Sequence, residues 1–212
     1  MALSEQGPFR LGVLGSGLGS NFDSIAQGCA AGAIPAEIAL VLSDVEDSGI
    51  LRSAKALGVP IRYIAPGGFR TKLDEAAETE YIAALREAEV DLVVLAGFMR
   101  ILKGEFLKAY EGRVINIHPS LLPSFPGLEA WKQALDHGVK VTGCTVHFVD
   151  QGVDMGAIIA QETVHVRDDD TTESLLARIH DAEHRIYPAA IAMIAHGEIE
   201  LRGRRTFQKV DP

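Results

Sequence analysis

Short apolar segments alternate with longer amphipathic segments along the first half of the chain. The apolar segments predict buried strands at Phe9–Leu14, Ile38–Ser43, Ile61–Ile64, Leu92–Leu95 and Val114–Ile117. Helical patterns lie between them, near Asn21–Ala31, Ile50–Leu57, Thr71–Glu87 and Gly104–Tyr110. Because strands that alternate with helices form parallel sheets, we expect an α/β fold: a Rossmann-like, mostly parallel twisted sheet with helices on both faces.

The second half of the chain has a different pattern. A short helix is expected near Leu128–His137, followed by strands at Val141–Asp150 and Ala157–Val164. Only a short connector joins these two strands, so they should form an antiparallel pair added late to the sheet. A long C-terminal helix from about Thr172 to His196 follows, with Thr171 or Thr172 as its N-cap. Loosely ordered ends are expected at residues 1–8 and 202–212.

Composition favours one domain over residues 1–212, because the chain has 212 residues and 47% of them are hydrophobic. The first eight residues show no signal-peptide pattern, and no stretch approaches the roughly 18 apolar residues of a membrane span. The two cysteines form no C-x-x-C pair and are expected to be reduced thiols. Together these features predict a cytoplasmic protein without a membrane partner.

The chain carries a formal net charge of −9, which argues against nucleic acid as a partner. An acidic protein repels anionic ligands at long range. Any anion that it binds must therefore be held by local donors.

A glycine-rich loop follows the first predicted strand and precedes the first predicted helix. It reads Gly15-Ser16-Gly17-Leu18-Gly19-Ser20-Asn21. Glycines allow the backbone to approach an anion closely, and a helix N-terminus offers free N–H groups and a favourable dipole. The loop therefore predicts a phosphate site, with Ser20 and Asn21 as side-chain donors or as the N-cap. A tight turn without a ligand is the alternative, because the spacing matches neither dinucleotide-binding nor phosphate-loop signatures.

Candidate chemistry lies at the end of the fifth predicted strand. Asn116 and His118 are two residues apart on an extended segment, so their side chains point to the same side. An amide can donate to a developing oxyanion, and an imidazole can transfer a proton near neutral pH. Asp154 lies in the glycine-flanked connector of the late strand pair and could favour the charged imidazole. Asp150 is the second candidate for that role.

Other interpretations apply to the same residues. His118 could be a packed, hydrogen-bonded histidine, and Asp154 could simply form a turn. A metal site made by His118, His147 and Asp154 matches no common zinc spacing, so no metal is expected. His147 should face the core or support the site. His180 and His184, four residues apart on the last helix, indicate a surface or packing face.

Four segments together resemble the phosphoribosylglycinamide formyltransferases, a family of folate-dependent enzymes in purine synthesis. These segments are Gly17–Asn21, Leu95–Leu102, Asn116–Pro123 and Thr145–Asp150, in order and correctly spaced. The resemblance covers about Leu11 to Leu201. The Asn-x-His-Pro-Ser-Leu-Leu-Pro string is shared by the wider folate formyltransferase superfamily, and the Gly-Ser-Asn end of the first loop points to this member.

The resemblance implies a role for each matching position. The catalytic residues would be Asn116, His118 and Asp154, and the ribonucleotide would be held by Gly19, Ser20, Asn21 and Glu183. The folate pocket would be formed by Arg70, Met99, Arg100, Ile101, Leu102, Asn116, Val149 and Asp150. The substrates implied are glycinamide ribonucleotide and 10-formyltetrahydrofolate, the second as co-substrate. No metal is implied, and the protein could be a monomer or a homodimer.

Three other functions remain open. A formyltetrahydrofolate hydrolase would use the same three catalytic residues on water, but usually carries an extra N-terminal regulatory domain, whereas the first strand here begins by residue 9. A methionyl-tRNA formyltransferase would need a further RNA-binding domain and a basic surface. A non-catalytic nucleotide-binding module would explain the first loop but leave Asn116, His118 and Asp154 without a purpose.

Overall fold

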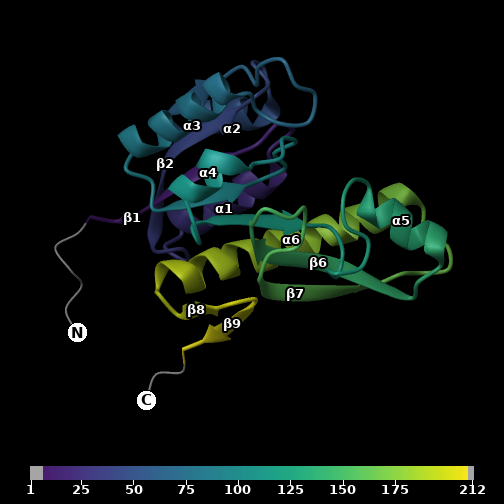
Figure 1. Ribbon diagram of the computed structural model, residues 1–212. Helices are drawn as coiled ribbons and strands as arrows, with labels where there is room; N and C mark the ends of the chain where they lie inside the picture. The colour runs from purple at the N-terminus through teal and green to yellow at the C-terminus, as the bar shows by residue number, and fades with distance from the viewer. Residues whose placement is uncertain (1–6, 210–212) are drawn as a thin grey trace.

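The computed structural model describes residues 7–209 and contains one nine-stranded sheet in the order β3-β2-β1-β4-β5-β6-β7-β9-β8 (Figure 1). The first five strands pair in parallel. Their bounds are β1 Phe9–Leu14, β2 Ala36–Ser43, β3 Ile61–Tyr63, β4 Leu92–Leu95 and β5 Val114–His118. The predicted Rossmann-like parallel sheet is confirmed, and its strand bounds differ from the expected ones by at most two residues at either end.

The order of the parallel strands reverses beside β1, because the chain runs from β1 to β2 and β3 on one side and reaches β4 and β5 on the other. In open α/β sheets, ligands bind outside the carboxyl ends of the strands at such a switch point. The loops after β1, β4 and β5 are therefore the place to look for a site.

Two hydrophobic clusters fill the space between the sheet and its helices. One cluster joins the sheet to α1 (Ser20–Ala30), α2 (Gly49–Ala56) and α6 (Thr172–Ala195). The other joins the opposite face to α3 (Glu75–Glu87) and α4 (Gly104–Ala109). Neighbouring strand residues alternate between the clusters, as Val93 and Val94 do, because successive side chains point to opposite faces. The predicted helices on both faces are thus confirmed.

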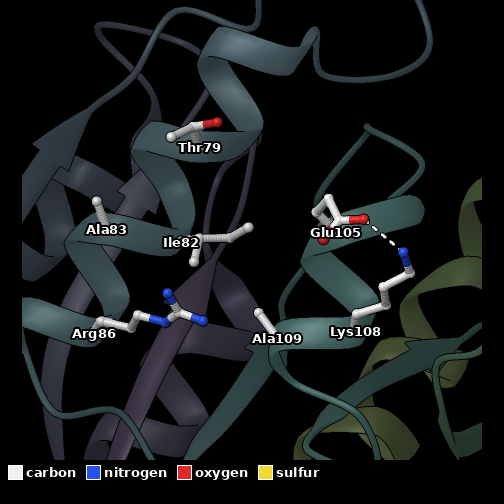
Figure 2. Close-up of a pocket in the computed structure, with 7 residues that line it drawn as sticks. All are labelled: Thr79, Ile82, Ala83, Arg86, Glu105, Lys108 and Ala109. Carbon is white, nitrogen blue, oxygen red and sulfur yellow. Dashed lines mark hydrogen bonds and ion pairs between the residues drawn. The ribbon is translucent and has the colours of Figure 1, made fainter.

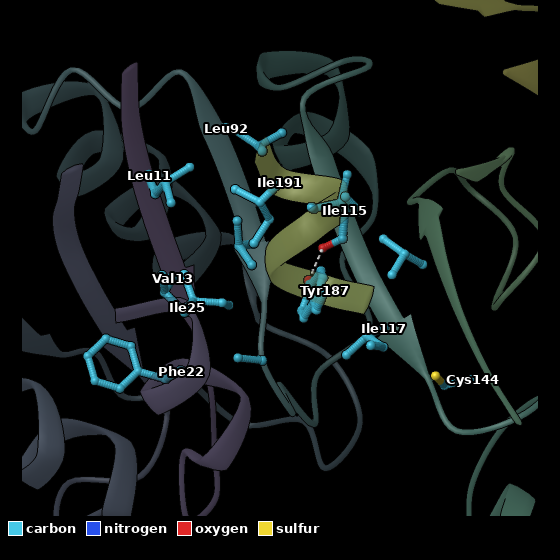
Figure 3. Packing of buried hydrophobic residues seen from close by; sticks show 14 of the residues in the cluster. Leu11, Val13, Phe22, Ile25, Leu92, Ile115, Ile117, Cys144, Tyr187 and Ile191 are labelled. Carbon is cyan, nitrogen blue, oxygen red and sulfur yellow. Dashed lines mark hydrogen bonds between the residues drawn. The ribbon is translucent and has the colours of Figure 1, made fainter. Parts of the chain in front are cut away.

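Tyr187 of α6 fixes this helix against the sheet (Figure 3). Its side chain is fully buried, and its hydroxyl donates a hydrogen bond shared between the carbonyl oxygens of Leu95 (2.9 Å) and Ile115 (3.2 Å). A buried hydroxyl needs such a partner, because an unsatisfied polar group in the core destabilises the fold.

The late part of the sheet is antiparallel, as predicted. Strand β6 (Val141–Phe148) pairs with β5 on one side and with β7 (Ile158–His165) on the other. Helix α5 (Ala130–His137) precedes this pair and packs against α6. Thr171 is the N-cap of α6 and forms a capping box with Ser174, which confirms one of the two residues expected there.

Two sequence-based predictions need correction. The third helix begins at Glu75 rather than near Thr71, because Asp74 caps it by accepting a 2.9 Å hydrogen bond from the amide of Ala77. The predicted loose end at 202–212 was wrong for residues 202–208. Strands β8 (Ile199–Arg202) and β9 (Arg205–Gln208) form a hairpin there, and β9 joins β7 at Arg205 and Ile158. Residues 1–6 and 210–212 of the predicted loose ends lie outside the described part of the chain.

Within residues 7–209, no helix combines the length and the apolar character that a membrane crossing requires.

Candidate active site

Asn116 and His118 lie at the carboxyl end of β5, beside a cavity of about 500 Å³. Their side chains share one side of the strand, whereas Ile115 and Ile117 point into the core cluster on the other. Strand β5 pairs in parallel with β4 and antiparallel with β6, so both of its edges are held. The sheet therefore fixes the backbone beneath both polar side chains.

His118 is 5% exposed and faces an oxygen on each side. Its Nε2 lies 2.9 Å from the carbonyl oxygen of Phe125, and its Nδ1 lies 3.4 Å from Oδ2 of Asp154. A carbonyl can only accept, so Nε2 carries a proton. Nδ1 therefore faces the carboxylate, an acceptor that could receive a proton donated from the other ring nitrogen. Asp154, rather than Asp150, is the carboxylate that meets His118.

Asp154 is held by the backbone around it. Its backbone is in the left-handed region at φ 54°, and its Oδ2 accepts a 2.8 Å hydrogen bond from the amide of Gly127. Asp150 instead accepts a 2.8 Å hydrogen bond from the amide of Gly152 and shapes the loop. Gly156 closes the loop where no side chain fits, since a Cβ there would lie 1.7 Å from the carbonyl oxygen of Phe148.

His147 supports Asn116 from the neighbouring strand. The two residues are opposite each other in the β5–β6 register, with Asn116 Nδ2 at 3.4 Å from His147 Nε2. His147 Nδ1 lies 2.8 Å from the carbonyl oxygen of Phe148, so Nδ1 carries the proton and Nε2 accepts from Asn116. Burial lowers the pKa of His147, which favours this neutral ring. His147 Nε2 also lies 3.8 Å from Oδ1 of Asp154.

The sequence predicted that His147 would face the core or support the site, and its burial agrees with that prediction. Its contact with Asn116 could not be foreseen. It depends on the antiparallel register of two strands whose sequences do not specify how they align.

The cavity wall contains most of the residues predicted to bind folate. Seven of them line it: Met99, Arg100, Ile101, Leu102, Asn116, Val149 and Asp150. Met99 is 61% exposed, so it offers an apolar surface at the mouth of the cavity. Trp131 of α5, which the sequence did not single out, also lines the wall. Arg70 lies outside the wall with an exposed side chain, and its backbone carbonyl accepts a hydrogen bond from Arg100.

The first loop lies next to the cavity but outside its lining. Gly19 is the N-cap of α1 at φ 93°, and among residues 7–209 no side chain caps this helix end. Ser20 and Asn21 are therefore the first helical residues rather than the cap, which corrects one of the two roles predicted for them. The free N–H groups at this end can receive an anion. The amide of Ser16 donates a 3.0 Å hydrogen bond to the carbonyl of Gly97, which brings the loop against the cavity wall.

Glu183 of α6 lies beside this helix end. Its Oε2 accepts a 2.9 Å hydrogen bond from Asn21 Nδ2, and the residue is 3% exposed. Burial raises the pKa of Glu183 to about 7, and the hydrogen bond from Asn21 opposes that rise. The structure thus brings Asn21 and Glu183 together, two residues that were predicted to serve one ligand.

A second hollow, of about 450 Å³, lies between α3 and α4 (Figure 2). Its lining comes from these two helices alone, and Lys108 forms a 2.6 Å ion pair with Glu105 across one helical turn. None of the predicted site residues lies there. Across residues 7–209, no group of three or more His, Cys, Asp or Glu residues is arranged to hold a metal ion.

Comparison with known proteins identifies the family. Residues 9–191 match the model of the formyl transferase family. The chain belongs to this family. The phosphoribosylglycinamide formyltransferase of Bacillus subtilis is 42% identical over 185 residues, which are 87% of this chain and 94% of that protein. The resemblance predicted from the sequence motifs is thereby confirmed.

Two further proteins show that similar chains occur both alone and as one part of a longer protein. A trifunctional purine biosynthetic protein of Gallus gallus is 46% identical over 194 residues. The matched region covers 91% of this chain but only 19% of that protein's length. The crystal structure of glycinamide ribonucleotide transformylase 1 from Symbiobacterium toebii is 47% identical with a TM-score of 0.93, covering 100% of this chain and 99% of that one. This formyl transferase is therefore similar both to free-standing enzymes and to one part of a multifunctional protein.

Proposed function

We propose that this formyl transferase moves the formyl group of 10-formyltetrahydrofolate to the primary amine of glycinamide ribonucleotide, a step of de novo purine synthesis. One observation carries the proposal: Asn116, His118 and Asp154 meet in one cavity, next to a helix N-terminus suited to a phosphate. The names of the relatives support glycinamide ribonucleotide as the acceptor and a formyl group as the group that is moved.

The ribonucleotide would bind with its phosphate at the start of α1. The backbone amides from Gly19 to Asn21 and the hydroxyl of Ser20 would donate to the phosphate oxygens. These are the local donors that a protein of net charge −9 needs to hold an anion. Glu183 would accept hydrogen bonds from the sugar or the glycinamide part, because Asn21 engages just one of its two oxygens.

The reduced folate would occupy the cavity of about 500 Å³, a volume that suits a ligand of this size. Its flat ring system would lie among the apolar side chains of the wall, with Val149 and Asp150 in the loop beside it. The segment from Met99 to Leu102 would supply backbone and side-chain contacts along the ligand. Arg70 would meet the far, anionic end outside the cavity, which accords with its exposed position.

The neutral amine would attack the formyl carbon, and the carbonyl π electrons would move to the formyl oxygen. Asn116 Nδ2 and the His118 imidazolium would stabilise this oxyanion. The His118 Nε2–H that now faces Phe125 would turn to the oxyanion. The tetrahedral intermediate would then collapse, the bond from carbon to N10 would break, and the proton lost by the amine would reach N10. Tetrahydrofolate and the formylated ribonucleotide would leave.

Asp154 would keep His118 charged and oriented, and His147 would hold the Asn116 amide with its N–H groups toward the substrate. Both support residues are themselves fixed by backbone contacts, at Gly127 and Phe148 respectively. Most of the rate enhancement would then come from positioning and from preorganised donors rather than from a covalent intermediate.

The deciding experiment follows the absorbance of 10-formyltetrahydrofolate with and without glycinamide ribonucleotide. Tetrahydrofolate that forms only when the ribonucleotide is present supports the transferase. Equal product without the acceptor would identify a hydrolase, the second candidate, and no turnover would favour a nucleotide-binding module. The proposal includes a single-domain protein in the cytoplasm, acting as a monomer or a homodimer, and the two free cysteines accord with a reducing compartment.

A further inference from the structure

Asp44 is a buried carboxylate at the carboxyl end of β2, outside the predicted catalytic residues. Its side chain is 1% exposed, and both of its oxygens have partners. Oδ1 accepts a 2.5 Å hydrogen bond from the hydroxyl of Ser16, and Oδ2 accepts a 2.7 Å hydrogen bond from Nε of Arg100. The switch-point rule for parallel sheets places β2 beside the site, but the sequence analysis did not select this residue.

The two partners of Asp44 belong to the two proposed substrate sites. Ser16 lies in the glycine-rich loop that precedes α1, and Arg100 lies in the cavity wall. The Ser16 hydroxyl also accepts a 2.9 Å hydrogen bond from the amide of Met99, next to Arg100. Asp44, Ser16, Met99 and Arg100 therefore form a closed set of contacts, which we call the Asp44 network.

Arg100 extends the network to a further segment. Its NH1 donates to the carbonyl oxygen of Phe69 at 3.1 Å and to that of Arg70. Its side chain is 18% exposed, so the guanidinium is largely covered and its Nε and NH1 donors are already engaged. Arg100 thus holds the wall together in this structure, in addition to lining the cavity.

A carboxylate in this setting resists replacement. Hydrogen bonds between charged groups are shorter and stronger than neutral ones, and removing one partner leaves the other buried without compensation. An asparagine at position 44 has one acceptor oxygen, and its nitrogen can only donate. It cannot accept from Ser16 and Arg100 in the way that the two carboxylate oxygens do, so one arm of the network would be lost.

We propose that Asp44 is a positioning residue that fixes the cavity wall at Met99 and Arg100 against the first loop, and so couples the binding of the two substrates. The inference rests on the proposed function, because it assigns the ribonucleotide to the loop and the folate to the wall. A ligand that orders one side of the network orders the other, and by thermodynamic linkage each substrate then raises the affinity for the other by the same factor.

The test compares Asp44→Asn with Asp47→Asn in the full chain. Asp47→Asn makes the same change of charge three residues away, but the Asp47 side chain is 86% exposed and pairs with Arg52 at the surface. Trp131 is the only tryptophan of the chain and lines the cavity, so its fluorescence reports tetrahydrofolate binding without turnover. Titrations are run with and without glycinamide ribonucleotide, alongside steady-state kinetics with both substrates.

Asp44→Asn is expected to weaken tetrahydrofolate binding and to raise KM for both substrates by about tenfold, with kcat reduced by no more than about threefold. The ribonucleotide should strengthen tetrahydrofolate binding in the wild type and in Asp47→Asn, and this effect should disappear in Asp44→Asn. Ser16→Ala removes the hydroxyl that donates to Asp44 and accepts from Met99, without a buried charge change, and it serves if Asp44→Asn does not fold. Ser16→Ala should also weaken tetrahydrofolate binding, raise KM and reduce the coupling between the substrates, but by smaller factors than Asp44→Asn.

Two results would overturn the proposal. One is Asp44→Asn or Ser16→Ala with affinities and coupling within about twofold of the wild type. The other is a loss of kcat with unchanged KM and affinity, which would place Asp44 in the chemical step rather than in positioning. Turnover of the wild type is measured first. If the wild type transfers no formyl group to the ribonucleotide, the proposed function is refuted, and this result is distinct from a failure of the Asp44 network.

Discussion

The side-chain amide of Asn21, in the first turn of α1, donates a 2.9 Å hydrogen bond to the carboxylate of Glu183 on α6. These residues are 162 positions apart in the chain. The contact ties the helix end that is suited to a phosphate to a buried acidic group. A ligand with an anion at one end and hydrogen-bond donors a short distance away fits this pair, as a phosphorylated sugar with an amine does.

The first prediction concerns the stability of the protein as a function of pH. Burial raises the pKa of Glu183 from 4.5 to about 7, so the folded protein binds this proton more tightly than the unfolded chain does. The free energy of unfolding should therefore fall as pH rises from 4.5 to about 7, by roughly 3 kcal/mol from this group. Urea unfolding measured across this range tests the slope.

Glu183→Gln should remove that part of the slope, because its amide stays neutral throughout. Glu80→Gln is the matched control, since Glu80 is exposed on α3. If Glu183→Gln and Glu80→Gln kept the same pH slope as the wild type, Glu183 would not carry the effect.

The second prediction concerns the first loop. Gly19→Ala should raise KM for the ribonucleotide by about tenfold, because an alanine at φ 93° is strained and its Cβ would lie 2.8 Å from Cα of Ile50. Gly17→Ala is the control, because its Cβ would meet nothing within 4 Å. Steady-state kinetics with the ribonucleotide as the varied substrate separates the two. Equal KM values in both variants would argue against a phosphate at this helix end.

The third prediction concerns Asn116. Asn116→Ala should lower kcat by about a hundredfold, or roughly 3 kcal/mol of barrier, because it removes one donor to the oxyanion. KM for the folate should change little, and Trp131 fluorescence should still report tetrahydrofolate binding. Turnover near that of the wild type would remove Asn116 from the catalytic residues.

The fourth prediction concerns the C-terminal hairpin. Arg204, between β8 and β9, donates a 3.0 Å hydrogen bond to the carbonyl oxygen of Met155, the residue after Asp154. Arg204→Ala should raise KM for the folate by about threefold, since the contact is exposed and a single hydrogen bond contributes modestly. Arg202→Ala, which instead removes a surface pair with Glu200, should leave KM unchanged. A similar KM in both variants would show that the hairpin does not influence the loop.

The sequence predicted the parallel part of the fold well because its central strands, β1 and β4, are mostly apolar runs. Strands that are buried on both faces need such runs, and Phe9–Leu14 and Leu92–Leu95 were placed with their observed ends. Asn116 and His118 could be selected because they are polar residues at the end of one of these strands. Their common side follows from the two-residue period of a strand.

The hairpin at 199–208 could not be predicted in this way. Its sequence is polar, and what orders it is contact with distant residues: Thr206 Oγ1 donates a 2.7 Å hydrogen bond to the carbonyl of Ile158, and the strand pairing adds Arg205. Asp44 was missed as a site residue, and the contact of His147 with Asn116 could not be foreseen, for a related reason. Each acts through a partner far along the chain, and only the folded sheet brings these partners together.

The shared hydrogen bond of Tyr187 has a consequence for substrate choice. Glu183 lies one turn before Tyr187 on α6, and the tyrosine hydroxyl engages the carbonyls of Leu95 and Ile115, the second of which directly precedes Asn116. A slip of α6 along the sheet would break both contacts. Core packing therefore fixes the distance from the Glu183 carboxylate to the Asn116 amide. We expect this distance to select acceptors by their length, independently of movements in the surface loops.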